Sequence, residues 1–161
     1  MKLYYDKPET LSAAIPGERR GIVNREILFR GKRIDTGEWA EGFYCGGNER
    51  KTLRPCIFVY IPDRQSYDCQ DIIPETLGQY TGLYDKNNVR IFENDIVIIG
   101  GNKSFPTMIE FLSGSWQCVR KYTDKGREKE YSYLHRLEYD NPNKYEVIGN
   151  RFDNPELLKG K

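Results

Sequence analysis

The amino-acid sequence predicts a fold made mostly of short β-strands. Runs rich in β-branched and aromatic residues alternate with the turn-forming residues Gly, Asn, Asp and Pro along most of the chain. The segment PETLGQYTGLYDKNNVRIFENDIVIIGG, residues 74–101, shows this pattern most clearly, because polar turns separate its apolar runs. With 161 residues, 38% of them hydrophobic and 30% charged, the chain is long and apolar enough for the core of one domain or of two small subdomains.

The first hairpin is expected between residues 26 and 47, where two β-rich runs meet at the turn Asp35-Thr36-Gly37. Successive residues of a strand point to opposite faces of its sheet. One face is therefore expected to carry Trp39, Glu41, Phe43 and Cys45, and the other face Ala40, Gly42 and Tyr44. Because Glu41 lies among large side chains, we expect either that its face is partly exposed to solvent or that its strand lies at an edge of the sheet.

The later elements are predicted in the same way. Pro55–Ile61 is apolar throughout, which predicts a strand covered on both faces, whereas the polar segment 63–73 predicts a loop. Further strands are expected at Leu77–Leu83, Val89–Phe92, Ile96–Ile99, Thr107–Leu112, Ser115–Tyr122 and Tyr145–Gly149. A short terminal helix is expected after Asn154, with this Asn as its cap and Pro155 at its first position.

Two segments differ from this strand pattern. Residues 1–25 contain Pro8, Pro16, Gly17 and Gly21, and we interpret them as an arm that a neighbouring subunit orders. Residues 121–144 mix positive and negative side chains with tyrosines, which is typical of a solvated surface rather than of a basic patch. The arm and the exposed strand edges together predict a homo-oligomer.

Charge and cysteine content narrow the functional classes. The formal net charge is +1, whereas proteins that grip nucleic acid through phosphates carry a clear basic excess. The four cysteines Cys45, Cys56, Cys69 and Cys118 are far apart in sequence, which argues against a zinc site and predicts reduced thiols in a cytosolic protein. Neither a secretory leader nor an apolar stretch of membrane-spanning length is found, so no membrane partner is expected.

Three blocks of the sequence, in this order, resemble the YopX family of phage and prophage proteins: ILFRGKRIDTGEWAEGFYCGG, PETLGQYTGLYDKNNVRIFENDIV and YEVIGNRFDNPELL. The resemblance runs from Glu26 to Leu158. It implies an α+β fold, mostly β, in which the arm 1–25 precedes an N-terminal α+β subdomain, 26–91, and a small SH3-like β-barrel subdomain, 92–161, with a short C-terminal helix. It also implies a phage-encoded protein of the bacterial host cytoplasm, but no catalytic activity or ligand.

The sequence departs from the family pattern at Asn88 and Asn94, where the family usually has glycine. Asn is the non-glycine residue that best tolerates the left-handed backbone region. We therefore expect a positive φ at both positions, and we interpret these turns as geometric devices rather than as sites of close ligand approach.

The sequence shows none of the residue combinations that support catalysis. The lone His135 lies in the charged segment and is interpreted as a surface residue. Glu93 and Asp95 flank a turn, and we interpret them as acceptors of hydrogen bonds from its backbone N–H groups. Phosphate-binding glycine loops are absent as well. We therefore expect a protein that is not an enzyme and that needs no cofactor and no metal.

Arginines beside aromatic residues indicate binding instead, because Arg recognises phosphate and aromatic rings stack on bases. The expected ligand is a nucleotide-derived host signalling molecule that a phage counter-defence protein sequesters. The candidate ligand-binding residues are Arg30, Arg33, Trp39, Tyr44, Gln79, Tyr80 and Thr81. The alternative is a macromolecular adaptor that binds a host protein or nucleic acid through the SH3-like barrel or the basic N-terminal segment.

Overall fold

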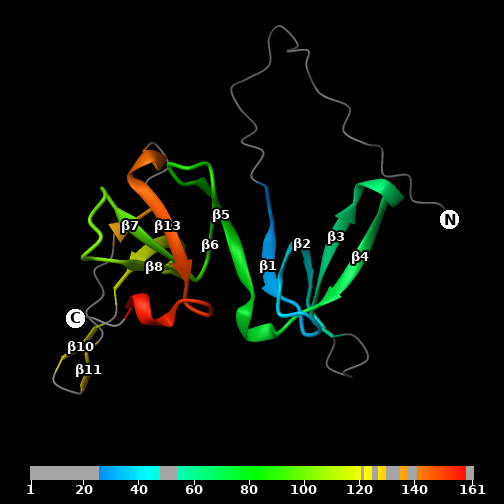
Figure 1. Cartoon of the computed structure of the whole chain (residues 1–161), viewed down its shortest axis with the longest axis horizontal. Coiled ribbons are helices and arrows are strands. Elements are labelled where there is room, and N and C mark those ends of the chain that lie inside the picture. Colours follow the sequence, from blue (N-terminus) through cyan, green and yellow to red (C-terminus); the bar gives the residue numbers. More distant parts are fainter. Residues whose placement is uncertain are drawn as a thin grey trace, which may run out of the picture.

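The computed structural model describes residues 26–47, 54–120, 122–124, 127–129, 135–137 and 141–158, which form two antiparallel β-sheets and short 3-10 helices (Figure 1). Within these ranges no helix has the length and apolar character needed to cross a membrane.

The first sheet contains six strands in the order β4-β3-β2-β1-β5-β6. Their bounds are β1 (Phe29–Lys32), β2 (Trp39–Cys45), β3 (Cys56–Ile61), β4 (Ser66–Asp71), β5 (Gly78–Tyr84) and β6 (Arg90–Phe92). The predicted turn at residues 35–37 connects β1 to β2, and Gly37 adopts a φ of 72°, which a side chain would disfavour.

The second sheet contains five strands in the order β12-β9-β8-β7-β13. Their bounds are β7 (Asp95–Ile99), β8 (Thr107–Leu112), β9 (Ser115–Val119), β12 (His135–Arg136) and β13 (Tyr145–Asn150). The strands β10 (Tyr122–Asp124) and β11 (Arg127–Lys129) pair only with each other. Residue 135, predicted to lie in a surface segment, forms part of edge strand β12 opposite Cys118.

The hairpin of β5 and β6 belongs to the first sheet but extends toward the second (Figure 1). Its residues Leu83 and Ile91 are buried in one cluster with Val97, Ile109 and other side chains of the second sheet. A smaller cluster of Ala40, Ile57 and Ile72 lies against the first sheet. The shared hairpin therefore couples the two sheets through apolar packing.

The predicted fold class is wrong in two respects, although a mostly β protein was expected correctly. First, the N-terminal subdomain is not α+β, because the described residues contain no α-helix. Their helical turns η1 (Pro62–Arg64), η2 (Pro74–Thr76), η3 (Pro142–Lys144) and η4 (Pro155–Leu158) are each a short 3-10 helix that begins at a proline. Second, the second sheet is not a closed barrel, because its edge strands β12 and β13 do not pair with each other.

Several local predictions are also corrected. Residues 66–71 form strand β4 rather than a loop, since they pair along their whole length with β3. Strand β3 is fully covered only at Cys56 and Ile57. The terminal helix is 3-10, and the Asn154 side chain accepts a bond from the Asn150 backbone N–H at 3.3 Å instead of capping the helix.

The expected positive φ at Asn88 and Asn94 is confirmed, with values of 62° and 69°. Asn88 lies in the turn that closes the β5–β6 hairpin, and Asn94 lies in the turn that leads from β6 in the first sheet to β7 in the second. The predicted arm, residues 1–25, and part of the charged segment 121–144 lie outside the described residues.

Candidate functional site

A cluster of arginines and aromatic rings lies on one face of the first sheet, beside the second sheet. The strand register places Arg30 directly between Glu41 on β2 and Gly78 on β5. The Arg30 guanidinium carbon lies 4.6 Å from the centre of the Trp39 ring and 4.7 Å from that of Phe92. A Cβ at Gly78 would lie only 2.7 Å from the Glu93 carbonyl oxygen, so glycine permits this close approach.

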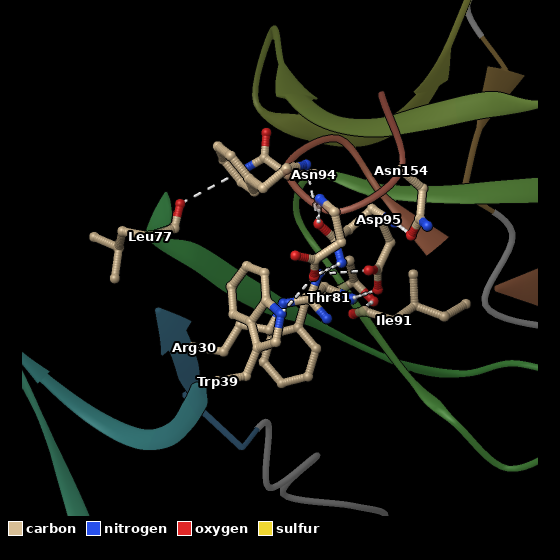
Figure 2. A network of polar contacts seen from close by, with 12 residues as sticks. Arg30, Trp39, Leu77, Thr81, Ile91, Asn94, Asp95 and Asn154 are labelled. Atoms are coloured by element: carbon tan, nitrogen blue, oxygen red, sulfur yellow. Dashed lines mark hydrogen bonds and ion pairs between the residues drawn. The ribbon is translucent and has the colours of Figure 1, made fainter. Parts of the chain in front are cut away.

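Arg30 is also an ion-pair partner of Asp95, the first residue of β7 (Figure 2). Asp95 is buried, with 1% of its side chain exposed, and it accepts a second bond from the Phe92 backbone N–H at 2.7 Å. Burial raises the pKa of Asp95 to about 6, and Arg30 opposes this rise. The Arg30–Asp95 pair therefore joins the two sheets and holds the guanidinium between the two rings.

A second polar contact joins the sheets at Asp153, which follows β13. Its carboxylate accepts bonds from the Trp39 indole N–H at 2.8 Å, from the Asn150 side-chain amide at 2.8 Å, and from Lys32. Although burial acts in the opposite direction, these bonds together hold the pKa of Asp153 at about 2. Trp39 is thus fixed by its indole N–H and by its ring contact with Phe152, whose centroid lies 6.1 Å away.

The more exposed end of the cluster, which we call the Arg90 site, consists of Tyr80, Tyr84 and Arg90 on the β5–β6 hairpin. Tyr80 is buried against Phe92, whereas Tyr84 is 39% exposed and packs edge-on against Tyr80 at 5.8 Å. The Arg90 guanidinium carbon lies 5.8 Å from the centre of the Tyr80 ring. Burial and a hydrogen bond with Tyr84 raise the pKa of the Tyr80 hydroxyl, so this group stays neutral.

Arg90 is paired only loosely, although its Nε is buried and has no hydrogen-bond partner among the described residues. Its guanidinium lies 3.6 Å from Glu26 and 3.5 Å from Glu41, and 37% of its side chain is exposed. Exposed ion pairs of this kind contribute about 0–1 kcal/mol each. An oxyanion such as phosphate can therefore replace the two carboxylates at low cost, while the ring of Tyr84 offers a surface for stacking.

The structure brings three of the seven predicted ligand-binding residues together: Arg30, Trp39 and Tyr80 are linked through Phe92. Tyr44 lies on the opposite face, where its ring contacts Phe29 at 5.6 Å. Gln79 pairs with Phe29 across β1 and β5 and shares that opposite face.

The other two predicted residues are held by different contacts. Arg33 binds Asp35 through two bonds of 2.9 and 2.6 Å in the exposed first turn. Thr81 is completely buried, and its hydroxyl donates to the Ile91 carbonyl at 2.8 Å.

Sequence reasoning missed Tyr84 and Arg90 as site residues. A usable signal was present, because both flank the turn at residues 85–88 and Arg90 precedes Phe92 by two positions. This spacing places their side chains on the same face as Tyr80, since Tyr84 pairs with Arg90 and Tyr80 pairs with Phe92.

A second exposed feature lies at the far end of the same sheet face. Phe43, Tyr60 and Tyr67 are 55%, 45% and 55% exposed, and the ring of Tyr67 lies 6.0 Å from Phe43 and 5.4 Å from Tyr60. We call this group the aromatic patch. Its strand β4 is an edge strand with one hydrogen-bonded neighbour in the sheet. In the described part of the chain, no group of three or more His, Cys, Asp and Glu side chains is arranged to hold a metal ion.

The architecture thus consists of two open antiparallel sheets that share an apolar hairpin and are joined by the buried Arg30–Asp95 ion pair and by the contacts of Asp153. The family model for the YopX protein matches residues 28–159, and the chain therefore belongs to the YopX family. This confirms the resemblance seen in the three sequence blocks.

A solved structure with a similar fold is the crystal structure of protein EF1440 from Enterococcus faecalis. It is 22% identical to this chain, and the match covers 83% of this chain and 98% of that one, with a TM-score of 0.50. The similarity extends to the fold alone. No curated protein matches the chain.

Proposed function

We propose that this YopX protein is a non-enzymatic phage accessory protein that sequesters a nucleotide-derived host signalling molecule at the Arg90 site. The observation that carries the proposal is the pairing of an exposed, loosely held guanidinium with an exposed tyrosine ring on one rigid hairpin. The proposal also includes action in the cytoplasm of the bacterial host, as a homo-oligomer.

The recognition would rest on two physical contributions. Charge-assisted bonds from Arg90 to a phosphate group replace its bonds to Glu26 and Glu41. Stacking of a base on Tyr84 adds about 1–3 kcal/mol. Both contributions bind a nucleotide without attacking it, which is why we propose capture rather than turnover.

Arg30 and Trp39 support the site in this proposal rather than contacting the ligand. Arg30 is engaged by Asp95 and enclosed by two rings, and Trp39 is engaged by Asp153. Together they fix Phe92, against which Tyr80 packs. A rigid support lowers the entropy cost of ordering the binding residues.

A second candidate function is that of an adaptor for a host protein, and the aromatic patch favours it. Clustered exposed aromatic rings beside an edge strand are typical of protein-binding surfaces, because an added strand supplies backbone bonds and the rings supply apolar contact. This surface lies on β2, β3 and β4 of the first sheet, whereas the sequence placed the adaptor surface on the SH3-like barrel or on the basic N-terminal segment.

The test incubates the full chain with extract of infected cells, separates the protein, heats it and analyses the released small molecules by mass spectrometry. We expect an intact nucleotide-type molecule from the wild type and from Arg120→Gln, but a strongly reduced amount from Arg90→Gln and Tyr84→Ala. Arg120 is a matched control because it also stacks on an exposed ring, that of Phe105 at 3.9 Å, on the second sheet.

Other outcomes decide against the proposal. Recovery of a cleaved nucleotide would make the protein an enzyme. Equal release from the wild type and Arg90→Gln would place the ligand elsewhere. Absence of any ligand, together with a host protein that is retained by the wild type and lost with Tyr67→Ala, would favour the adaptor.

A further inference from the structure

The fold gathers three of the four cysteines, which are far apart in sequence, on one face of the first sheet. Cys45 on β2 lies directly opposite Cys56 on β3. Cys56 in turn lies opposite Asp71 on β4, and Cys69 is two residues from Asp71 on the same side of that strand. All four cysteines are free thiols, as the sequence predicted, but their distance in sequence did not reveal that these three are neighbours.

The three thiols differ in access and in contact. Cys69 is exposed on the edge strand, Cys45 is half-buried and Cys56 is buried. Cys56 lies diagonally opposite Cys69 on the neighbouring strand, whereas the Cys45 thiol donates to the carbonyl oxygen of Gly46 at 3.8 Å. Burial, together with these neighbours, raises the pKa of Cys56 to about 12.

We propose that Cys69 and Cys56 form a dithiol site that is oxidised to a cross-strand disulfide by exchange with a low-molecular-weight disulfide. The exposed Cys69 is the entry point and the buried Cys56 is the resolving residue. Cys69 suits the first role because it is accessible, and Cys56 suits the second because it is the diagonal neighbour of Cys69 on the adjacent strand.

The exchange proceeds in two balanced steps. The Cys69 thiolate attacks one sulfur of the small disulfide, so that a mixed disulfide forms and one small thiol leaves. The Cys56 thiolate then attacks the Cys69 sulfur and releases the second small thiol. The protein loses two protons and two electrons, and the small disulfide is reduced to two thiols.

The surroundings predict a slow and reversible bond. Diagonal positions on neighbouring strands are farther apart than the usual disulfide span, so β4 must shift along β3. An edge strand can make this movement because it is paired on one side only. A strained disulfide is reduced more easily than a relaxed one, which suits a reversible modification.

The modification would also alter the aromatic patch. Cys69 pairs with Phe58, and Tyr67 of the patch lies two residues before it on the same side of β4. A shift of β4 along β3 moves the ring of Tyr67 relative to that of Phe43. Oxidation of the dithiol site would therefore change the affinity of the aromatic patch for a molecule that binds it.

The test treats the native full chain with oxidised glutathione and follows it by intact mass and by peptide mapping under non-reducing conditions. We expect the wild type to lose two hydrogen atoms without a lasting glutathione adduct, and a Cys56–Cys69 peptide pair to appear. The rate should rise from pH 7 to pH 8, because both steps need a thiolate.

Variants separate the two roles. Cys56→Ser should keep a glutathione adduct on Cys69, and Cys69→Ser should form neither adduct nor cross-link in the same time. Cys118→Ser is the matched control, because Cys118 is buried in the other core, and it should behave as the wild type.

The peptide map of the wild type decides the matter even if a variant fails to fold. A Cys45–Cys56 pair, a lasting glutathione adduct on wild-type Cys69, or an unchanged mass would each overturn the proposal.

Discussion

Replacing Arg30 with Met tests whether the buried Arg30–Asp95 pair holds the two sheets together. Met keeps an unbranched apolar side chain between the rings of Trp39 and Phe92 but removes the charge. Asp95 then keeps only the Phe92 backbone N–H as a partner, and its side chain is 1% exposed. Removing one partner of a buried pair costs about 3–5 kcal/mol, because the other charge is left uncompensated.

The cost should depend on pH, because the Asp95 carboxyl group can escape it by taking up a proton. In the wild type the pKa of Asp95 is about 6, above its ordinary value of 3.8, so the folded state binds more protons than the unfolded state in this range. The contribution of Asp95 to stability is therefore full below about pH 4 and is lost as the pH rises to 6. A rise from 3.8 to about 6 corresponds to about 3 kcal/mol.

Without Arg30 the pKa of Asp95 rises further. The variant therefore has a neutral Asp95 at pH 5, whereas at pH 8 folding must either bury an unpaired carboxylate or protonate it at a cost in free energy. The free energy of unfolding, measured with urea at both pH values, should show a larger loss for Arg30→Met at pH 8 than at pH 5. The double variant Arg30→Met/Asp95→Asn should recover most of the loss at pH 8, since no charge remains buried.

The reasoning fails if Arg30→Met loses the same free energy at both pH values, or less than about 1 kcal/mol at pH 8. The first result would mean that Asp95 is already neutral or already solvated in the wild type. The second would mean that the pair does not join the sheets.

The other predictions concern single positions. Asn94→Val should lower the free energy of unfolding by about 1–2 kcal/mol more than Asn94→Gly, because the φ of 69° disfavours a β-branched residue; equal melting temperatures would refute this. Gly42→Ala should lower the free energy of unfolding by about 1–3 kcal/mol or more, because the added Cβ would lie 2.0 Å from the Phe58 carbonyl oxygen. An unchanged melting temperature would contradict this expectation. Asp153→Asn should lower the melting temperature at pH 6. The difference from the wild type should narrow as the pH falls from 4 to 2, because the pKa of Asp153 is held at about 2. A constant difference would speak against its bonds to Lys32 and Trp39. Light scattering at micromolar concentration should show an oligomer, and a monomer would refute that expectation.

The tight turns could be predicted from the sequence because they carry residues with a specific backbone requirement. Gly37, Asn88 and Asn94 all adopt the positive φ that their residue types allow. Strand β4 could not be predicted in this way. Its sequence SYDCQD is polar because it is an exposed edge strand, so the apolar alternation that reveals a strand is absent.

The candidate site could be predicted only in part, for a related reason. Residue type indicated Arg30, Trp39 and Tyr80, but which face each one occupies depends on strand order and register. Tyr44 and Gln79 lie on the other face of the sheet, next to Phe29. Register is a long-range property, and a shift by one residue reverses every side chain of a strand.

The thiol site illustrates the same limit. Cys45, Cys56 and Cys69 have no motif spacing, and they become neighbours only because β2, β3 and β4 run antiparallel in adjacent positions. The α-helical part of the N-terminal subdomain and the closed barrel, both expected from the resemblance, are absent from the described residues, whose helical turns are short 3-10 helices that begin at prolines.

The most direct test of the proposed function is a calorimetric titration of the full chain with a panel of linear and cyclic nucleotides. We expect at least one to bind the wild type, Arg120→Gln and Tyr60→Ala with similar affinity. We expect Arg90→Gln and Tyr84→Ala each to bind it at least about tenfold more weakly, which corresponds to about 1.4 kcal/mol for a lost phosphate contact or a lost stacked base. Equal affinity of the wild type and Arg90→Gln, or no binding across the panel, would contradict nucleotide capture at the Arg90 site.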